Sequence, residues 1–140
     1  MFERYTQAAR VAIFAARYHA GESDSVSIET EHLLLGLADA DGALLRRVLG
    51  SEELVEALCK ELRPTSVRPH VTAGGDLPLT DESKRVLAYG AEEGSRLGHQ
   101  RLDTEHLLVG LMREENCRAA QVLRERGLTL EQARKDLEQL

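Results

Sequence analysis

The sequence has few of the residues that build large or rigid cores. Among its 140 residues there is no tryptophan, and aromatic residues make up only 4%. Its three prolines all lie between Arg63 and Leu79, so the rest of the chain lacks the residue that most strongly breaks helices. The core must therefore come from leucine, valine and alanine, which favours closely packed helices.

Several classes of protein are disfavoured by what is missing. The formal net charge is −6, and the basic footprint usual in duplex-binding proteins is absent. No signal peptide or membrane-length apolar run is visible. Cys59 and Cys117 form no CxxC pair and are predicted to be reduced thiols, with a disulfide between them as the alternative. We therefore expect a cytoplasmic protein without a nucleic-acid or membrane partner.

What the sequence does contain is one long internal repeat. The segment 30–37 reads Thr-Glu-His-Leu-Leu-Leu-Gly-Leu, and the segment 104–111 reads Thr-Glu-His-Leu-Leu-Val-Gly-Leu. The same offset in numbering (104 − 30 = 74), without a gap, pairs Thr6 with Thr80, Arg10 with Lys84, and Val48-Leu49 with Val122-Leu123. A chain this short with one such repeat is most simply a duplicated helical unit.

Caps and apolar spacing predict four helices in each copy and no strand. In the first copy, helices are predicted from Thr6 to about Ala20, from Thr30 to the turn at 40–42, over 43–49, and from the Ser51 cap to Leu62. In the second, they are predicted from the Thr80 cap to about Leu97, from Thr104, around 119–123, and after the Thr129 cap as far as Leu137. The copies span residues 1–62 and 80–140, and a linker over 63–79 holds every proline. Because short helices are marginal alone, we expect the copies to pack together as a single all-α domain.

Small residues predict how the helices cross. Gly36, Gly90 and Gly94 lie inside helices, where glycine costs about 1 kcal/mol relative to alanine, and they indicate a close helix crossing in both copies. On the first helix, Val11 and Tyr18 share a face with several alanines. We expect that face to pack inward.

The recurring residues suggest a ligand site at helix N-termini. Helices are predicted to begin at four threonines, which are Thr6, Thr30, Thr80 and Thr104. Free N–H groups at a helix start suit an anion such as phosphate. Glu31 and Glu105, next to two of these starts, suit a guanidinium, so the two features together fit a ligand that carries both charges. The alternative is that the threonines are caps and the glutamates complement the helix dipole.

Other chemistry finds little support in the sequence. His32 and His106 stand beside the glutamates, but without an HExxH motif or a Cys/His cluster no metal site is predicted, and each histidine is expected to bond nearby backbone. No GxxxxGKS/T phosphate loop is present, and no cofactor is expected. A small helical hydrolase using His106 or Cys117 is the enzymatic alternative, although no nucleophile, base and orienting group occur together.

The doubled motif, with Phe-Glu-Arg-Tyr-Thr at 2–6 and Leu-Gly-His at 97–99, resembles the Clp N-terminal repeat domain. The most similar version is the one at the front of ClpC-type unfoldases, and the resemblance runs from Met1 to about Leu137. It implies a pseudo-twofold bundle of two four-helix repeats that is not an enzyme. Such a module recruits substrate and adaptor proteins to a hexameric Clp ATPase, which unfolds them into a peptidase chamber. The alternative is a free-standing adaptor or competitor of that ATPase.

The resemblance also implies that the module binds phosphoarginine, a degradation mark. It places one site at Thr6 with Glu31 and the second at Thr80 with Glu105. The glutamate would hold the guanidinium, and the threonine hydroxyl with nearby helix N–H groups would hold the phosphate.

Two departures from the family pattern bear on that expectation. Glu29 and Asp103 stand where ClpC-type members usually have glycine. At about 6 Å and an effective dielectric near 20, two unit charges repel by roughly 3 kcal/mol, so these carboxylates are expected to oppose a phosphate. The loop from Glu22 to Ser27 lacks the Leu-Gly-His of the second copy, which predicts unequal sites.

Overall fold

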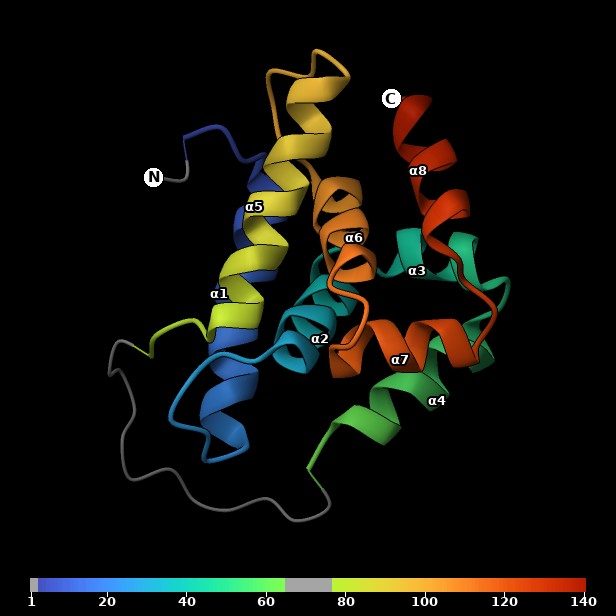
Figure 1. The fold of residues 1–140 in the computed structure, drawn as a ribbon. Helices are drawn as coiled ribbons and strands as arrows, with labels where there is room; N and C mark the ends of the chain where they lie inside the picture. Colours follow the sequence, from blue (N-terminus) through green and yellow to red (C-terminus); the bar gives the residue numbers. More distant parts are fainter. Residues whose placement is uncertain (1–2, 65–76) are drawn as a thin grey trace.

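The computed structural model describes residues 3–64 and 77–140, so most of the predicted linker lies outside the described residues. The described residues form eight α-helices and no strand (Figure 1). The helices are α1 (Gln7–Glu22), α2 (Thr30–Ala40), α3 (Gly42–Leu49), α4 (Glu52–Leu62), α5 (Asp81–Arg96), α6 (Thr104–Arg113), α7 (Arg118–Glu125) and α8 (Leu130–Glu138). The predicted all-α class and its helices are confirmed.

Most helix starts follow the predicted capping. A side-chain oxygen accepts the N–H three residues ahead, at 3.1–3.2 Å, at four predicted caps: Thr6, Ser51, Thr80 and Thr129. Thr30 and Thr104 differ, because they are the first residues of α2 and α6 and the N-cap positions belong to Glu29 and Asp103. An acidic side chain therefore stands at the start of each Thr-Glu-His helix.

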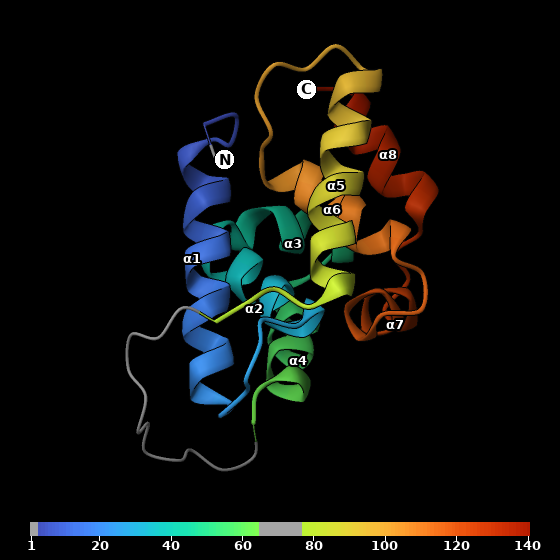
Figure 2. The same cartoon turned by 60° about the vertical axis from the view of Figure 1, so that its left-hand side comes forward.

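Helices α2 and α6 form the centre of the bundle. In Figure 2, α2 lies between α1 and α5, α6 crosses behind α5, and the remaining helices pack around them. Their leucines are almost fully excluded from solvent, since Leu34, Leu37, Leu108 and Leu111 are at most 1% exposed. A helix that is apolar nearly all round must be buried, which explains why the repeated motif occupies the middle of the fold.

Glycines allow the central helices to approach their neighbours closely in both copies. A Cβ added at Gly36 would lie 2.1 Å from the backbone oxygen of Ala12, and one added at Gly110 would lie 2.2 Å from that of Val86. Gly90 repeats the pattern, with the His106 oxygen 2.8 Å from an added Cβ. The predicted close crossing is therefore confirmed in both copies.

The inward face of α1 differs from the prediction. Val11 is 46% exposed and Tyr18 is 61% exposed, whereas Ala12 and Ala16 are at most 1% exposed. The reason is the close crossing, because only alanine leaves room for the α2 backbone at Gly36. Val11 and Tyr18 therefore point away from the core.

The repeat keeps its register only through its first two helices. The start of α5 is offset from that of α1 by 74 residues (81 − 7 = 74), as is the start of α6 from that of α2 (104 − 30 = 74). The offset is larger between α3 and α7 (118 − 42 = 76) and larger again between α4 and α8 (130 − 52 = 78). The gapless alignment predicted for residues 48–49 and 122–123 is therefore wrong, because the turn after α6 is longer than the turn after α2.

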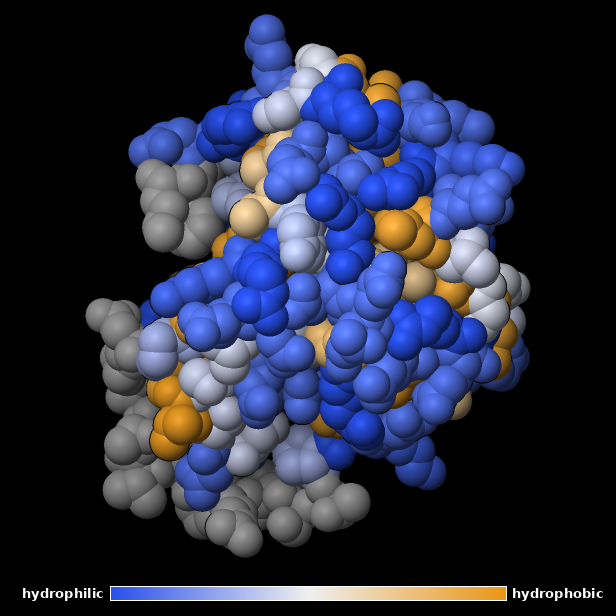
Figure 3. Space-filling model, in the orientation of Figure 1, coloured by the Kyte–Doolittle hydropathy of each residue, from blue (hydrophilic) through white to orange (hydrophobic). Residues whose placement is uncertain are grey.

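The exposed residues include a few large apolar side chains, among them Phe14, Tyr18 and Val26. The face drawn in Figure 3 is largely hydrophilic, with small hydrophobic areas separated by charged residues. None of the described helices has the length and apolar content that crossing a membrane requires.

Candidate ligand-binding sites

The segment that leads into α1 is tied to the start of α6 in the other copy. The Thr6 N–H donates to the Leu102 oxygen at 2.9 Å, and the Leu102 N–H donates to the Arg4 oxygen at 2.8 Å. The Thr6 hydroxyl donates to Asp103 Oδ1 at 2.9 Å. We call this place the Thr6 junction; it joins Thr6 to the helix start that carries Glu105.

Thr80 has the equivalent position against the start of α2. Its N–H donates to the Ile28 oxygen at 3.1 Å, and the Ile28 N–H donates to the Pro78 oxygen at 2.7 Å. The buried Ser83 hydroxyl also donates to the Ile28 oxygen, at 2.8 Å. We call this place the Thr80 junction; it joins Thr80 to the helix start that carries Glu31.

The predicted pairing of threonine with glutamate inside one copy is therefore wrong. The start of α6 packs beside Gly94, where an added Cβ would lie 3.3 Å from the His106 ring. Gly94 lies near the end of α5, and Thr80 caps the opposite end of the same helix. At a rise of about 1.5 Å per residue, roughly 20 Å of α5 separates Thr80 from the start of α6 and its Glu105. Each candidate site instead combines a threonine of one copy with the central helix of the other.

At the Thr6 junction, groups of the chain itself take the places of both ligand charges. Asp103 Oδ1 accepts the Thr6 hydroxyl at 2.9 Å and the Thr104 N–H at 2.8 Å, which are donors that a phosphate would use. Arg47 Nη2 of α3 lies 3.5 Å from Glu105 Oε2, where the guanidinium of a ligand would bind. An internal carboxylate and an internal guanidinium thus occupy this junction.

The Thr80 junction is acidic and more open. Glu31 is partly exposed, and its carboxylate has no hydrogen bond or ion pair among residues 3–64 and 77–140. Glu29 and Glu82 lie close by: loss of hydration, followed by the charges of Glu31 and Glu82, raises the pKa of Glu29. The Thr80 hydroxyl donates to Ser83 Oγ at 3.0 Å. This junction can therefore accept a cation without displacing an internal partner of Glu31.

The two histidines of the repeated motif bond backbone, as predicted. Nδ1 of His32 accepts the Glu29 N–H at 3.0 Å, and Nδ1 of His106 accepts the Asp103 N–H at 2.8 Å. Each ring therefore holds the first turn of its helix. Burial lowers the pKa of His32. The bonds leave both histidines without a free nitrogen lone pair in the neutral form, because the remaining nitrogen carries the proton.

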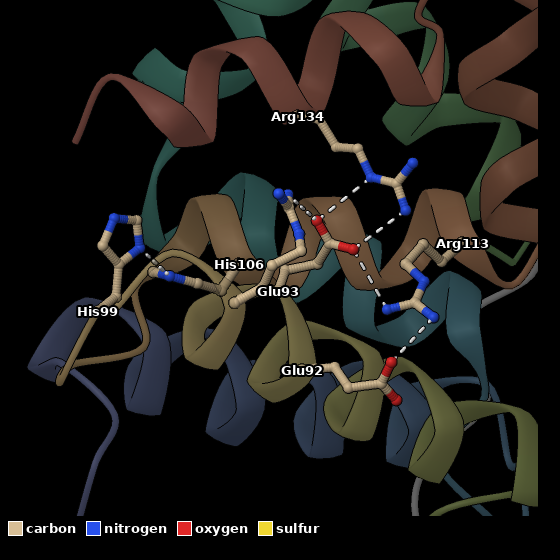
Figure 4. Close-up of polar contacts among 7 residues, drawn as sticks. Glu92, Glu93, His99, His106, Arg113 and Arg134 are labelled. Carbon is tan, nitrogen blue, oxygen red and sulfur yellow. Dashed lines mark hydrogen bonds and ion pairs between the residues drawn. The ribbon is translucent and has the colours of Figure 1, made fainter.

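A contact between His106 and His99 was not predicted from the sequence. Because Nδ1 of His106 is an acceptor, its Nε2 carries the proton and donates to Nδ1 of His99 at 2.9 Å (Figure 4). Burial, followed by the charge of His99, lowers the pKa of His106 from 6.5 to about 4. The Leu-Gly-His segment at 97–99, which the first copy lacks, was the sequence feature that could have indicated this histidine pair.

The residues weighed for metal binding and for nucleophilic chemistry can be located in the structure. Residues 3–64 and 77–140 contain no cluster of three or more potential His, Cys, Asp or Glu ligands. Cys59 and Cys117 are separate free thiols. Cys117 is fully buried and caps α7 by accepting the Ala120 N–H at 3.4 Å, and burial raises the pKa of its thiol. Such a thiol suits a structural role better than that of a nucleophile.

A cavity of about 420 Å³, bordered by Arg10, Ile28 and Leu79, lies beside the Thr80 junction, and none of the four predicted site residues borders it. A larger cavity, of about 740 Å³, lies between α2, α3 and α4 and is bordered by Asp39, Arg46 and Cys59. None of the four predicted site residues, Thr6, Glu31, Thr80 and Glu105, borders it. A ligand at either junction would therefore be held by charge and hydrogen bonds more than by enclosure.

Comparison with known sequences agrees with this architecture. A family model described as the Clp repeat (R) N-terminal domain matches residues 78–140, which form the second copy. The negative regulator of genetic competence ClpC/MecB of Bacillus subtilis is 35% identical over 148 residues, covering 100% of this chain and 17% of that protein. The chain therefore spans about a sixth of the length of this curated relative.

Solved structures share the fold of the whole chain. The N-terminal domain of the caseinolytic protease associated chaperone ClpD from Arabidopsis thaliana has a TM-score of 0.72 and 26% identity, covering 96% of this chain and 92% of that one. A chain from structural investigations of a malarial protein secretion system has a TM-score of 0.80 and 23% identity, with 97% and 92% coverage. With the doubled helical unit and its Thr-Glu-His helices in place, these matches show that the chain belongs to the family of Clp N-terminal repeat domains.

Proposed function

We propose that this chain is a non-catalytic docking domain that binds segments of substrate or adaptor proteins for a Clp ATPase. Its relatives include an ATP-binding subunit of an ATP-dependent Clp protease and a Clp chaperone. Both junctions offer groups that bind charged side chains, and the free thiols of Cys59 and Cys117 support the predicted cytoplasmic setting. The proposed partners are therefore substrate proteins, adaptors and the Clp machinery.

Within this role, the Thr80 junction is the open site and Glu31 is its principal ligand-binding group. The observation that carries this proposal is the contrast between two equivalent glutamates. Glu105 is held by Arg47 at 3.5 Å, whereas Glu31 has no partner in the described part of the chain. A guanidinium from a bound protein segment would form an ion pair with Glu31, as Arg47 does with Glu105.

Phosphoarginine is the finer form of this proposal, and the charges around each junction bear on it. Lys84 is exposed one turn after Thr80 and supports a phosphate there. Glu29 and Glu82 oppose it, and at the other junction Asp103 already takes the N-terminal donors of α6. We therefore expect unmodified arginine to bind at least as tightly as phosphoarginine.

Calorimetric titration separates these possibilities. A capped tripeptide Ala-Arg-Ala, its phosphoarginine form and an Ala-Gln-Ala control are titrated into the wild-type chain. We expect heat with arginine and none with glutamine, and a loss of at least about tenfold in affinity for Glu31→Gln but not for the matched variant Glu105→Gln. Equal binding of all three peptides, or no heat with either arginine form at millimolar peptide, would contradict the proposed site.

The docking role itself is tested without reference to arginine. The chain is fused to a Clp ATPase from which the corresponding domain has been removed, and degradation of an adaptor-dependent substrate is measured. Restored degradation supports a docking domain. If the separate chain instead binds the intact ATPase or reduces degradation, the adaptor or competitor form is favoured. No effect in either arrangement would count against both.

A further inference from the structure

A second charged feature lies away from both junctions, where α5, α6 and α8 meet. Glu93 of α5 is only 3% exposed and accepts hydrogen bonds from three arginines (Figure 4). Its Oε1 accepts from Arg96 Nη2 at 3.1 Å and Arg134 Nε at 3.2 Å, and its Oε2 accepts from Arg113 Nη1 at 3.2 Å and Arg134 Nη2 at 3.1 Å. Four bonds saturate a carboxylate, which has about four lone-pair positions. We call these four residues the Glu93 cluster.

The Glu93 cluster carries an excess of positive charge. Arg113 is also paired with Glu92 at 3.2 Å and lies 4.3 Å from the centre of the Tyr89 ring, and its side chain is only 21% exposed, so it is the least accessible of the three arginines. Counting Glu92 as well, three arginines against two glutamates leave a formal charge of 3 − 2 = +1. The complete chain has a formal charge of −6, so this place has the opposite sign to the molecule.

Two of the arginines keep unused donors that face solvent. The Arg96 side chain is 54% exposed and donates one hydrogen bond, and the Arg134 side chain is 40% exposed and donates two. A guanidinium has five N–H donors. The remaining N–H groups are available for planar, two-point recognition of another carboxylate.

Burial of Glu93 fixes these two guanidinium groups in advance. Burial alone raises the pKa of Glu93, but the hydrogen bonds from Arg134 and Arg96 outweigh it and the pKa is lowered. The carboxylate therefore stays charged and keeps both arginines in place. An exposed arginine ordinarily loses side-chain entropy on binding, and this anchoring reduces that cost.

The scaffold does not require arginines at this position. At the offset of the repeated motif, Glu93 corresponds to His19, Arg96 to Glu22 and Arg113 to Asp39. His19 bonds Asp39 at 2.6 Å, so the first copy builds the same place from an imidazole and carboxylates. A helix contact alone therefore does not explain the arginines of the second copy.

We propose that the exposed sides of Arg96 and Arg134, held by Glu93, bind an acidic segment of a partner protein through its Asp or Glu side chains. This surface is separate from the Thr80 junction, which takes a cation. A protein segment is favoured over nucleic acid, because two guanidinium groups on a chain of net charge −6 do not make a basic stripe.

The test uses a fluorescein-labelled hexaglutamate peptide and the complete chain. Fluorescence anisotropy at low salt is expected to show binding that weakens as salt rises, and a hexaglutamine peptide is expected not to bind. The double variant Arg96→Gln/Arg134→Gln is expected to weaken binding by about tenfold or more. Arg46→Gln is the matched control, because Arg46 is 49% exposed and pairs with a single carboxylate at 3.1 Å.

Further outcomes keep the proposal falsifiable. Far-ultraviolet circular dichroism establishes that the double variant is folded, and Arg96→Lys/Arg134→Lys is expected to retain part of the binding because charge remains without the planar fork. Glu31→Gln is expected to leave hexaglutamate binding unchanged, which separates this proposal from the one at the Thr80 junction. Absence of hexaglutamate binding by the wild-type chain, or an equal loss in Arg46→Gln, would overturn it.

Discussion

At equivalent places the two copies carry opposite charges. Helix α1 has His19 beside Glu22 and Asp39, whereas α5 has Glu93 beside arginines. The crossing of the first two helices is alike in both copies, since Gly36 and Gly110 meet the same turn of the neighbouring helix. Small residues therefore fix the helix crossing, while the charges next to the crossing differ between the copies and can carry separate binding properties.

The largest expected change in stability comes from substitutions at the helix crossing that both copies share. Gly36→Ala and Gly110→Ala each place a methyl group against a backbone oxygen, at 2.1 Å and 2.2 Å before any movement. We expect each to lower the free energy of unfolding by about 3 kcal/mol or more, because the helices must separate. Urea denaturation measures the change. Gly21→Ala is the control, since an added Cβ there has nothing within 4 Å and should stabilise α1 by up to about 1 kcal/mol.

A pH titration tests how the histidines of the two copies differ. The unfolded chain binds the His106 proton near pH 6.5 and the folded chain near pH 4, so the unfolded chain holds more protons between these values. The free energy of unfolding is therefore expected to fall as the pH drops from 6.5 to 4, by at most about 3 kcal/mol from this residue. NMR titration of the His106 and His32 rings checks whether these residues cause the pH dependence, since the pKa of His32 is also lowered from 6.5. A His106 pKa at or above 6.5 would contradict the bonding described for its ring.

Removing one charge tests the Glu93 cluster and its counterpart around His19, which has the opposite charge. Glu93→Gln keeps the shape of the side chain but weakens its bonds to three arginines, and we expect it to cost about 2 kcal/mol in unfolding free energy. His19→Gln should cost less, because its partner Asp39 is 43% exposed and can be hydrated instead. Thermal denaturation at neutral pH measures both. Equal costs would mean that the two clusters contribute alike to stability.

The smallest expected effect concerns the first threonine of each central helix. The Thr104 hydroxyl donates to Asp41 Oδ2 at 2.8 Å, whereas the buried Thr30 hydroxyl bonds no nitrogen or oxygen in the part of the chain that the structure describes and lies beside only the Cys117 thiol, a weak partner. Thr104→Val is expected to cost about 1 kcal/mol, and Thr30→Val to be neutral or stabilising. Chemical denaturation of both variants measures the difference. A similar loss for Thr30→Val would reveal a stronger partner for that hydroxyl.

The helices could be predicted because their signals are local. Thr6, Thr80 and Thr129 cap helices through bonds that span only three residues, and the doubled motif marks the central helices directly. The exact starts of α2 and α6 were less clear, because Asp103 and Thr104 are both good capping residues. The structure assigns the cap to the acidic residue.

The pairing at the junctions could not be predicted, because it depends on contacts between distant parts of the chain. Thr6 and Asp103 are 97 residues apart, and an intracopy pairing with Glu31 fits the sequence equally well. The Glu93 cluster was missed for the same reason, since Arg134 lies 41 residues from Glu93 in another helix. The four proposed site residues stay a prediction, with Thr6 grouped with Glu105 and Thr80 with Glu31.

In the proposed sites, each threonine comes from one copy and each glutamate from the other, so neither copy alone would possess a complete site. Occupancy and the docking of the two halves are thus thermodynamically linked, and a ligand that touches both must raise the melting temperature of the assembled domain. The converse also holds. A substitution that loosens the contact between the halves would reduce affinity without altering any residue that meets the ligand.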